Sequence, residues 1–217
     1  MRLHQKIDLH NHTRYSDGGL SAEELIRKKI DCGINVIGIT DHIENIIKID
    51  DYINEIHELA GKYSSSARII AGVEIEFERQ HIIIFGAQFI KNMLSGSDYT
   101  FPEYSGNDNY CVIVAHPIVV DLTDKLLKIA HGIEITFSGA LHPEYSTIDM
   151  IAGQYNLFKI ASSDTHKVEK TFDTCFEVDG VNIFSEEHVI RLFTDKKSKN
   201  KIFNVKYHVS DVNFLHR

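Results

Sequence analysis

The feature of this sequence that most limits its fold is a series of short apolar runs rich in β-branched residues. They cover residues 6–10, 35–42, 68–77, 81–89, 111–117, 132–138 and 158–166. In most of them the apolar residues are nearly continuous rather than alternating with polar ones, as expected for strands that are covered on both faces. The sequence therefore predicts a mostly parallel sheet that is buried between other layers.

Helical patterns separate most of these runs. A first helix is predicted over residues 21–33, where Ser21 and Glu24 have capping-box spacing and Gly33 provides a stop signal. Further helices are predicted over residues 50–63, 122–131, 143–156 and 185–197. The repeated strand–helix order predicts an α/β fold, in the form of a closed or nearly closed parallel barrel.

Two segments interrupt this alternation. The runs at 68–77 and 81–89 are too close in sequence for an intervening helix, so we expect a hairpin there. Residues 90–110 are polar and rich in Gly, Ser, Asn and Tyr, and they are predicted to form a long loop. No repeat or linker divides the 217 residues, which suit one substantial core. We therefore expect a single domain over residues 1–217.

Charge and cysteine content narrow the class of protein. The formal net charge of −8 argues against non-specific binding to nucleic acid or to anionic membranes. The 3 cysteines are scattered, which is typical of reduced thiols in the cytoplasm. No apolar run reaches the roughly 18 residues that a membrane-spanning helix needs. The sequence thus predicts a cytoplasmic protein without a membrane partner.

Histidine, aspartate and glutamate recur where the predicted strands end. These candidate ligands are His10, His12, Asp17, His42, Glu74, His81, His116, Asp164 and His166. The carboxyl ends of parallel barrel strands meet at one face, and an antiparallel hairpin partner brings His81 to that same face. His10 and His12 point to the same side because strand side chains repeat every two residues, and Asp164 and His166 repeat that arrangement.

Nine imidazoles and carboxylates at one barrel mouth would raise the free energy of the folded state unless cations were bound between them. Zinc takes about four ligands and octahedral manganese about six, so nine residues exceed what one ion needs. We expect two or three divalent ions with one carboxylate bridging a pair. Mixed histidine and carboxylate ligands without thiolate suit zinc, manganese or iron, and the sequence does not choose among them.

The segments that carry these residues also resemble a known family. "DLHNHTRYSDG", "GITDH", "AGVEIE", the following His81, "VAHP" and "SSDTH" together are similar to the PHP family, the polymerase and histidinol phosphatase domain. The resemblance implies a distorted seven-stranded (β/α) barrel with its metal site at the carboxyl ends of the strands. It also implies a metal-dependent phosphoesterase, since the family includes histidinol phosphate phosphatases, nucleotide phosphatases and exonucleases.

The resemblance divides the candidate ligands among three metals. The first set is His10, His12, Glu74 and Asp164. The second set is Glu74, His81 and His116, with Glu74 as the bridge. The third set is Asp17, His42 and His166, and Asp17 stands where some members have histidine.

Clustered divalent ions suit hydrolysis of a phosphate ester by metal-activated water, with a small phosphorylated substrate or nucleotide as the expected partner. The leaving alkoxide would take a proton from metal-bound water or from an acid such as Asp17 or His42. Contacts to the phosphate could come from Arg14, Lys167 or Arg79, which lie beside the candidate ligands in sequence. The oligomeric state stays open.

Two alternatives remain. Barrel metal sites with a His-x-His motif also serve amidohydrolases, which cleave amides and other C–N bonds, although their usual metal-bridging lysine is not evident here. The other alternative is a non-catalytic, metal-stabilised module that docks onto a partner.

Overall fold

The computed structural model describes residues 5–94, 109–167, 173–178, 182–194 and 205–209. Its strands are β1 (Gln5–Asp8), β2 (Val36–Ile39), β3 (Arg68–Phe77), β4 (Gln80–Phe85), β5 (Cys111–Ala115), β6 (Gly132–Glu134), β7 (Thr136–Phe137), β8 (Ala140–Leu141), β9 (Phe158–Ile160), β10 (Cys175–Val178) and β11 (Val205–His208). Its α-helices are α1 (Ala22–Asp31), α2 (Ile49–Lys62), α3 (Ala87–Leu94), α4 (Asp124–Ile129), α5 (Tyr145–Tyr155) and α6 (Glu186–Thr194). Two short 3₁₀ helices are η1 (Ile43–Asn45) and η2 (Val119–Asp121).

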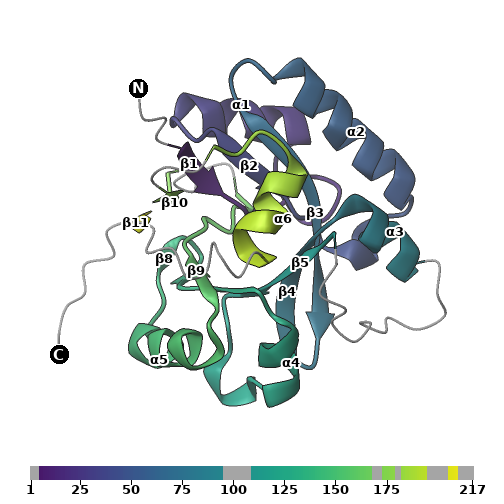
Figure 1. Cartoon of the computed structure of the whole chain (residues 1–217). Helices are drawn as coiled ribbons and strands as arrows, with labels where there is room; N and C mark the ends of the chain where they lie inside the picture. Colours follow the sequence, from purple (N-terminus) through teal and green to yellow (C-terminus); the bar gives the residue numbers. More distant parts are fainter. Residues whose placement is uncertain (1–4, 95–108, 168–172, 179–181, 195–204, 210–217) are drawn as a thin grey trace.

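The main sheet curves into a nearly closed α/β barrel (Figure 1). Its order is β11-β10-β1-β2-β3-β4-β5-β6-β9, and only β4 runs antiparallel to its neighbours between β1 and β9. The chain after β9 returns to the chain after β1 through a parallel bridge between Asn11 and Thr165. The barrel wall thus contains β1 to β6 and β9, while β10 and β11 extend the sheet from β1. The predicted α/β barrel and its β3–β4 hairpin are confirmed.

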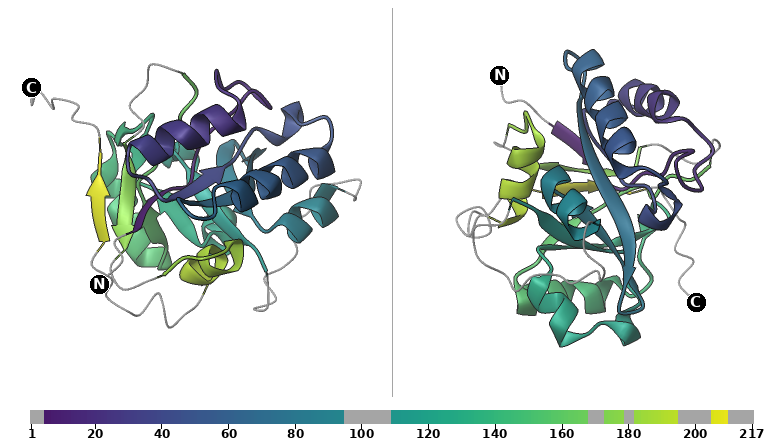
Figure 2. Two further views of the ribbon diagram at one scale, coloured as in Figure 1. Left: turned by 90° about the horizontal axis from the view of Figure 1, so that it is seen from above. Right: turned by 90° about the vertical axis from the view of Figure 1, so that its right-hand side faces the viewer.

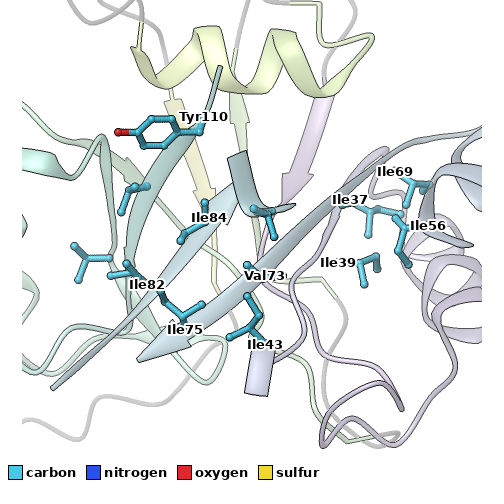
Figure 3. Close-up of a cluster of buried hydrophobic side chains, with 14 of the residues drawn as sticks. Ile37, Ile39, Ile43, Ile56, Ile69, Val73, Ile75, Ile82, Ile84 and Tyr110 are labelled. Carbon is cyan, nitrogen blue, oxygen red and sulfur yellow. The ribbon is translucent and has the colours of Figure 1, made fainter. Parts of the chain in front are cut away.

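Alternate side chains of the strands pack in two different places. Val73 and Ile75 of β3 face outward and join the cluster beneath the helices, as Figure 3 shows. Ile70 belongs to the second cluster, inside the barrel, together with Phe85. A Cβ added at Gly72 would lie 2.7 Å from the Phe85 ring, so this ring fills the interior only because its neighbour has no side chain. Figure 3 also shows the outer residues of β2 packed near α2.

The helices cover the outside of the sheet and close one end. Figures 1 and 2 show α1 and α2 side by side on one flank, with α4 and α5 on another. The predicted capping box is present in α1, where Ser21 and Glu24 bond reciprocally, and Gly33 follows the helix with a φ of +80°. From α6, Val189 and Phe193 pack into the interior cluster. The barrel is therefore a packed core rather than a pore.

Some predicted segments differ from the structure, and one is the strand predicted over residues 81–89, which ends at Phe85 because α3 begins at Ala87. The loop predicted over residues 90–110 is wrong at its start, because α3 continues to Leu94 and buries Ile90 and Met93; residues 95–108 lie outside the described part. Helix α3 begins where Glu186 accepts hydrogen bonds from the backbone N–H groups of Gly86 and Ala87, at 2.8 and 2.9 Å. This cap comes from a residue distant in sequence, so local pattern could not show it.

The predicted strand over residues 132–138 is divided between two sheets. Its first part, β6, lies in the barrel, and its last residues form β7, which pairs with β8 in a separate two-stranded ladder. Among the described residues, no helix has the length and apolar character needed to cross a membrane.

Candidate metal centre

The structure brings all nine candidate ligands to one end of the barrel. Each belongs to at least one of the clusters whose ligand atoms lie within 4.8 Å of one another. These clusters are His12, Asp17, His42 and His166; His10, Glu74 and His116; His10, His12 and Asp164; and His42, Glu74 and His81. The ligands follow β1, β2, β5 and β9 or lie within the β3–β4 hairpin, so the barrel topology alone explains their convergence.

Glu74 lies at the centre of the site, and its two carboxylate oxygens face different groups of histidines. The residue is 1% exposed. Its Oε2 atom lies 3.1–3.4 Å from imidazole nitrogens of His10, His12 and His42. Its Oε1 atom lies 2.9–3.2 Å from imidazole nitrogens of His81 and His116. Within the described residues neither oxygen has a hydrogen-bond partner, which is costly for a buried carboxylate unless something else binds it.

His10 and His12 meet as their spacing predicts. Their Nε2 atoms are 3.0 Å apart, and both approach Asp164 Oδ1, at 3.7 and 3.6 Å. Without a metal the two nitrogens can share one proton in a hydrogen bond, whereas a cation between them would use the lone pairs of both. Bonds of about 2.0–2.2 Å to zinc place neighbouring ligand atoms roughly 3.3 Å apart, close to these spacings.

The remaining ligands form the outer edge of the site. Asp17 Oδ1 lies 3.3 Å from His166 Nε2 and 3.8 Å from His42 Nε2. The Asp17 side chain is 56% exposed, in contrast to Glu74. Of the two candidate proton donors, Asp17 therefore faces solvent, whereas the His42 side chain is only 16% exposed.

The electrostatics of the buried ligands favour a cation. Burial acts to raise the pKa of Glu74, but the neighbouring His10 and His116 hold it well below its usual range, so the carboxylate stays charged. Burial lowers the pKa of His12 to about 4 despite the opposing effect of Glu74, which leaves a neutral imidazole with a free lone pair. Burial also acts to lower the pKa of His10, but Glu134, Glu74 and Asp164 raise it well above the usual value. At His10 a proton and a divalent cation therefore compete for the same nitrogen.

Comparison with known proteins identifies the family. A model of the PHP domain matches residues 8–174, which contain every candidate ligand. The chain belongs to the PHP domain family. The resemblance seen in the sequence motifs is thereby confirmed.

Two individual proteins are similar to this PHP domain in sequence. The chain is 33% identical over 138 residues to a protein of Haemophilus influenzae named 5'-3' exoribonuclease, covering 63% of this chain and 44% of that protein. It is 24% identical over 191 residues to the Uncharacterized protein MJ1295 of Methanocaldococcus jannaschii, covering 79% and 86% of the two chains. The chain thus spans less than half the length of the exoribonuclease.

A solved structure shares the fold. A two-domain protein of Bacteroides vulgatus, described as containing a predicted PHP-like metal-dependent phosphoesterase, superposes with a TM-score of 0.63 at 18% identity. The match covers 95% of this chain and 66% of the other. The two proteins therefore share their fold over nearly the whole of this chain.

Glu134 contacts two of the candidate ligands of this PHP domain, and the sequence motifs did not reveal it. It is buried on β6, where Oε1 lies 3.1 Å from His10 Nδ1 and Oε2 accepts a hydrogen bond from the His116 backbone N–H at 2.8 Å. A carboxylate behind a ligating imidazole fixes the ring and its tautomer. The signal available in sequence was a glutamate within an apolar strand, where charged residues are rarely buried without a partner.

A second buried network supports the ligands from below. Lys29 of α1 is fully buried, and its Nζ donates to Asp8 Oδ2 at 2.5 Å and to Ser163 Oγ at 2.7 Å. Asp8 in turn accepts from the backbone N–H groups of Ser163 and His10. This network joins β1 to the segment that carries Asp164. It therefore holds Asp164 near His10 and His12, which follow β1.

Backbone strain also concentrates here. His116 and Asp164 have φ values of +25° and +50°, which are rare for residues other than glycine. Such conformations cost roughly 1–3 kcal/mol each and persist where the surroundings impose them. Two hydrogen bonds hold these residues in place. The His116 N–H donates to the Glu134 carboxylate, and the Asp164 N–H donates to the His10 carbonyl.

Asp41 shapes the loop that carries the outer ligand. Its carboxylate accepts from the Thr13 backbone N–H and hydroxyl at 2.7 and 2.8 Å and from Ser16 Oγ at 2.6 Å. It therefore folds residues 13–17 over the site, and it is absent from the metal-ligand clusters found among the described residues.

The candidate phosphate-binding cations lie farther out. Arg14 Nη2 lies 3.5 Å from Glu24 Oε2, and Arg79 Nη1 lies 3.3 Å from Asp121 Oδ1. Lys167 is exposed beside His166. None of the contacts found among the described residues joins these cations to the nine ligands, so their role stays a prediction.

The residues present fit a group of divalent ions. The donors are imidazoles and carboxylates, which suit zinc, manganese or iron, and the hydrogen-bond capacity of Glu74 is unused among the described residues. Both the types of donor and the unused bonding capacity of the Glu74 carboxylate therefore fit a site for several metal ions.

Proposed function

We propose that this PHP domain is a metal-dependent phosphoesterase that hydrolyses a phosphomonoester or a nucleotide-type substrate. The observation that carries the proposal is the buried Glu74 carboxylate, whose two oxygens face different groups of imidazoles. Such an arrangement can hold two ions side by side, the requirement for clamping both the attacking and the leaving oxygen of a phosphoryl group. A further ion would be held by Asp17, His42 and His166.

When bound, zinc, manganese or iron ions supply Lewis acidity and an activated water. The chain's own residues divide the remaining tasks. Glu134 and the Lys29–Asp8 pair fix the ligand side chains before substrate arrives. Asp17 or His42 delivers a proton to the leaving alkoxide; Asp17 Oδ1 and His42 Nε2 lie 3.8 Å apart, and Asp17 is the more exposed of the two. Arg14 and Lys167 bind phosphoryl oxygens from the loops above it.

The substrate range follows from the family and from the relatives. The protein from H. influenzae named 5'-3' exoribonuclease shares 33% identity over 138 residues, so RNA with a 5'-phosphate belongs among the substrates to test. The alternatives are C–N hydrolysis and a docking role without turnover.

The test is a substrate panel on the purified chain. The protein is stripped with a chelator, reloaded with Mn²⁺, Zn²⁺ or Fe²⁺, and assayed with phosphomonoesters, phosphodiesters, 5'-phosphorylated RNA and amides. We expect phosphate ester hydrolysis that the chelator abolishes and the metal restores. His116→Ala should lose this activity, whereas His57→Ala, a change at an exposed histidine of α2, should retain it.

The other outcomes are equally informative. Turnover of amides alone would assign the protein to C–N hydrolysis. Bound metal without turnover of any substrate in the panel would favour the docking module.

A further inference from the structure

An aromatic side chain stands exposed beside the metal centre. Phe137 of β7 is 52% exposed, and its ring meets the ring of His116 edge-on with centroids 6.0 Å apart. On its other side it contacts His142 in the same way at 6.2 Å. The sequence motifs did not single out Phe137, because a lone aromatic within a predicted strand usually packs into the core.

The hairpin that carries Phe137 is fixed to the barrel. Thr136 Oγ1 donates to the Ser162 carbonyl at 2.9 Å and accepts from the Ser162 backbone N–H at 3.0 Å. At the turn, Thr174 Oγ1 donates to the Gly139 carbonyl at 2.8 Å. Because these bonds hold the backbone on both sides of the ring, Phe137 presents its surface with little conformational entropy left to lose on binding.

Other large apolar side chains are exposed in loops at the same end of the barrel. Ile47 and Ile118 lie in the connections after β2 and β5, and Val120 lies in η2, which also follows β5. Single exposed apolar residues are ordinary. Their concentration in the loops around one site favours a ligand with an apolar part.

The charged residues nearby also favour a small substrate over a nucleic acid. Arg14 and Arg79 each face an acidic side chain, which reduces their attraction for a polyanion. The formal net charge of −8 adds to this effect. A small ester with one phosphate and an apolar group suits this surface better than a long nucleic acid backbone.

We propose that Phe137 is a stacking surface for an aromatic ring in the alcohol part of the substrate. The inference rests on the proposed phosphoesterase function and specifies its substrate class. A phosphate held at the ions beside His116 places the group attached to its ester oxygen next to the Phe137 ring. Offset or edge-to-face contact between two rings is favourable beyond the area it buries, so the site would prefer an aromatic ester to a saturated one of similar size.

Benzyl phosphate and cyclohexylmethyl phosphate test this preference. Both are phosphomonoesters of primary alcohols with a six-membered ring, and they differ in aromaticity. Phe137→Ala should lower kcat/KM for benzyl phosphate by roughly five- to tenfold and that for cyclohexylmethyl phosphate by less than about twofold. Phe137→Trp should retain the preference, while Phe137→Leu should lose it although the site stays apolar.

Phe184→Ala is the matched control, because Phe184 is also about half exposed but lies near Arg68, where β3 begins, at the other end of the barrel. Metal content should be the same in all variants, since phenylalanine is no ligand. Equal losses for both esters, or no loss, would overturn the inference. So would hydrolysis of other phosphomonoesters with neither of these two turned over. Failure to hydrolyse any phosphate ester would instead defeat the proposed function itself.

Discussion

Seven of the nine candidate ligands fall into two sets that the chain supports in different ways, while His81 and His116 face Oε1 of Glu74. The inner set, His10, His12, Glu74 and Asp164, is buried, and side chains from β1, β6 and α1 hold it. The outer set, Asp17, His42 and His166, is partly or largely exposed and lies on loops. One group is therefore positioned by the barrel core and the other by loop residues such as Asp41.

This difference predicts unequal ion binding. Ligands that are already ordered lose little entropy when an ion binds, and a buried site strengthens their attraction for it. Exposed ligands compete with water and must be ordered by the ion. We therefore expect tightly held inner ions and an outer ion that exchanges, which leaves the outer position open to substrate in the way that catalytic metal sites require.

Glu74→Gln should give the largest effect, because one side chain faces both groups of imidazoles. The substitution keeps the shape and removes the charge. Loss of a residue that merely supports a ligand already costs roughly 10- to 100-fold, so activity should fall more than about 100-fold here. Elemental analysis should show more than one ion lost per chain.

His81→Ala is the comparison, since His81 contacts only Oε1 of Glu74 and is itself partly exposed. It should release less metal than Glu74→Gln, with folding of both variants followed by circular dichroism. If Glu74→Gln kept a full complement of metal while His81→Ala lost it, Glu74 would not be the bridge.

Asp17→Asn should have an intermediate effect and change only the outer set. We expect about tenfold lower activity, at the lower end of the range for groups that support a metal or transfer a proton. The inner ions should remain after dialysis while the outer one is lost. Raising the metal concentration should restore part of the activity if Asp17 acts as a ligand, and none of it if Asp17 acts only as the acid. Simultaneous loss of the inner ions would show that the two sets are not independent.

The sequence predicted the convergence of the inner and the outer candidate ligands equally well, although the structure supports the two sets so differently. Each ligand follows or lies within an apolar run, and barrel topology brings such positions together regardless of burial. His81 illustrates this best, because only the hairpin places the start of β4 at the same mouth. The pattern along the chain was therefore sufficient to predict that these residues lie together.

The supporting residues could not be found in the same way. Glu134 and His10 are far apart in sequence, as are Lys29 and Ser163, and no local motif links either pair. The start of α3 was missed for a similar reason, since its cap comes from Glu186. Interactions between distant segments depend on packing, which only the folded structure specifies.

Arg14→Ala should have the smallest effect, and it tests whether the loop beyond the outer set contacts the phosphate. Arg14 is 62% exposed and shares its charge with Glu24, so water and the carboxylate both weaken its hold on an anion. An exposed ion pair contributes about 0.2–1 kcal/mol, which corresponds to a loss in kcat/KM of at most about fivefold with metal content unchanged. Glu24→Gln frees Arg14 and keeps a side chain that can complete the α1 capping box, so it should leave kcat/KM the same or raise it.

Arg79→Ala is the control at the β3–β4 hairpin, where the arginine faces Asp121. If Arg79→Ala lowered kcat/KM and Arg14→Ala did not, the phosphate would approach from the hairpin side of the mouth, and the loop of residues 13–17 would serve only to position Asp17.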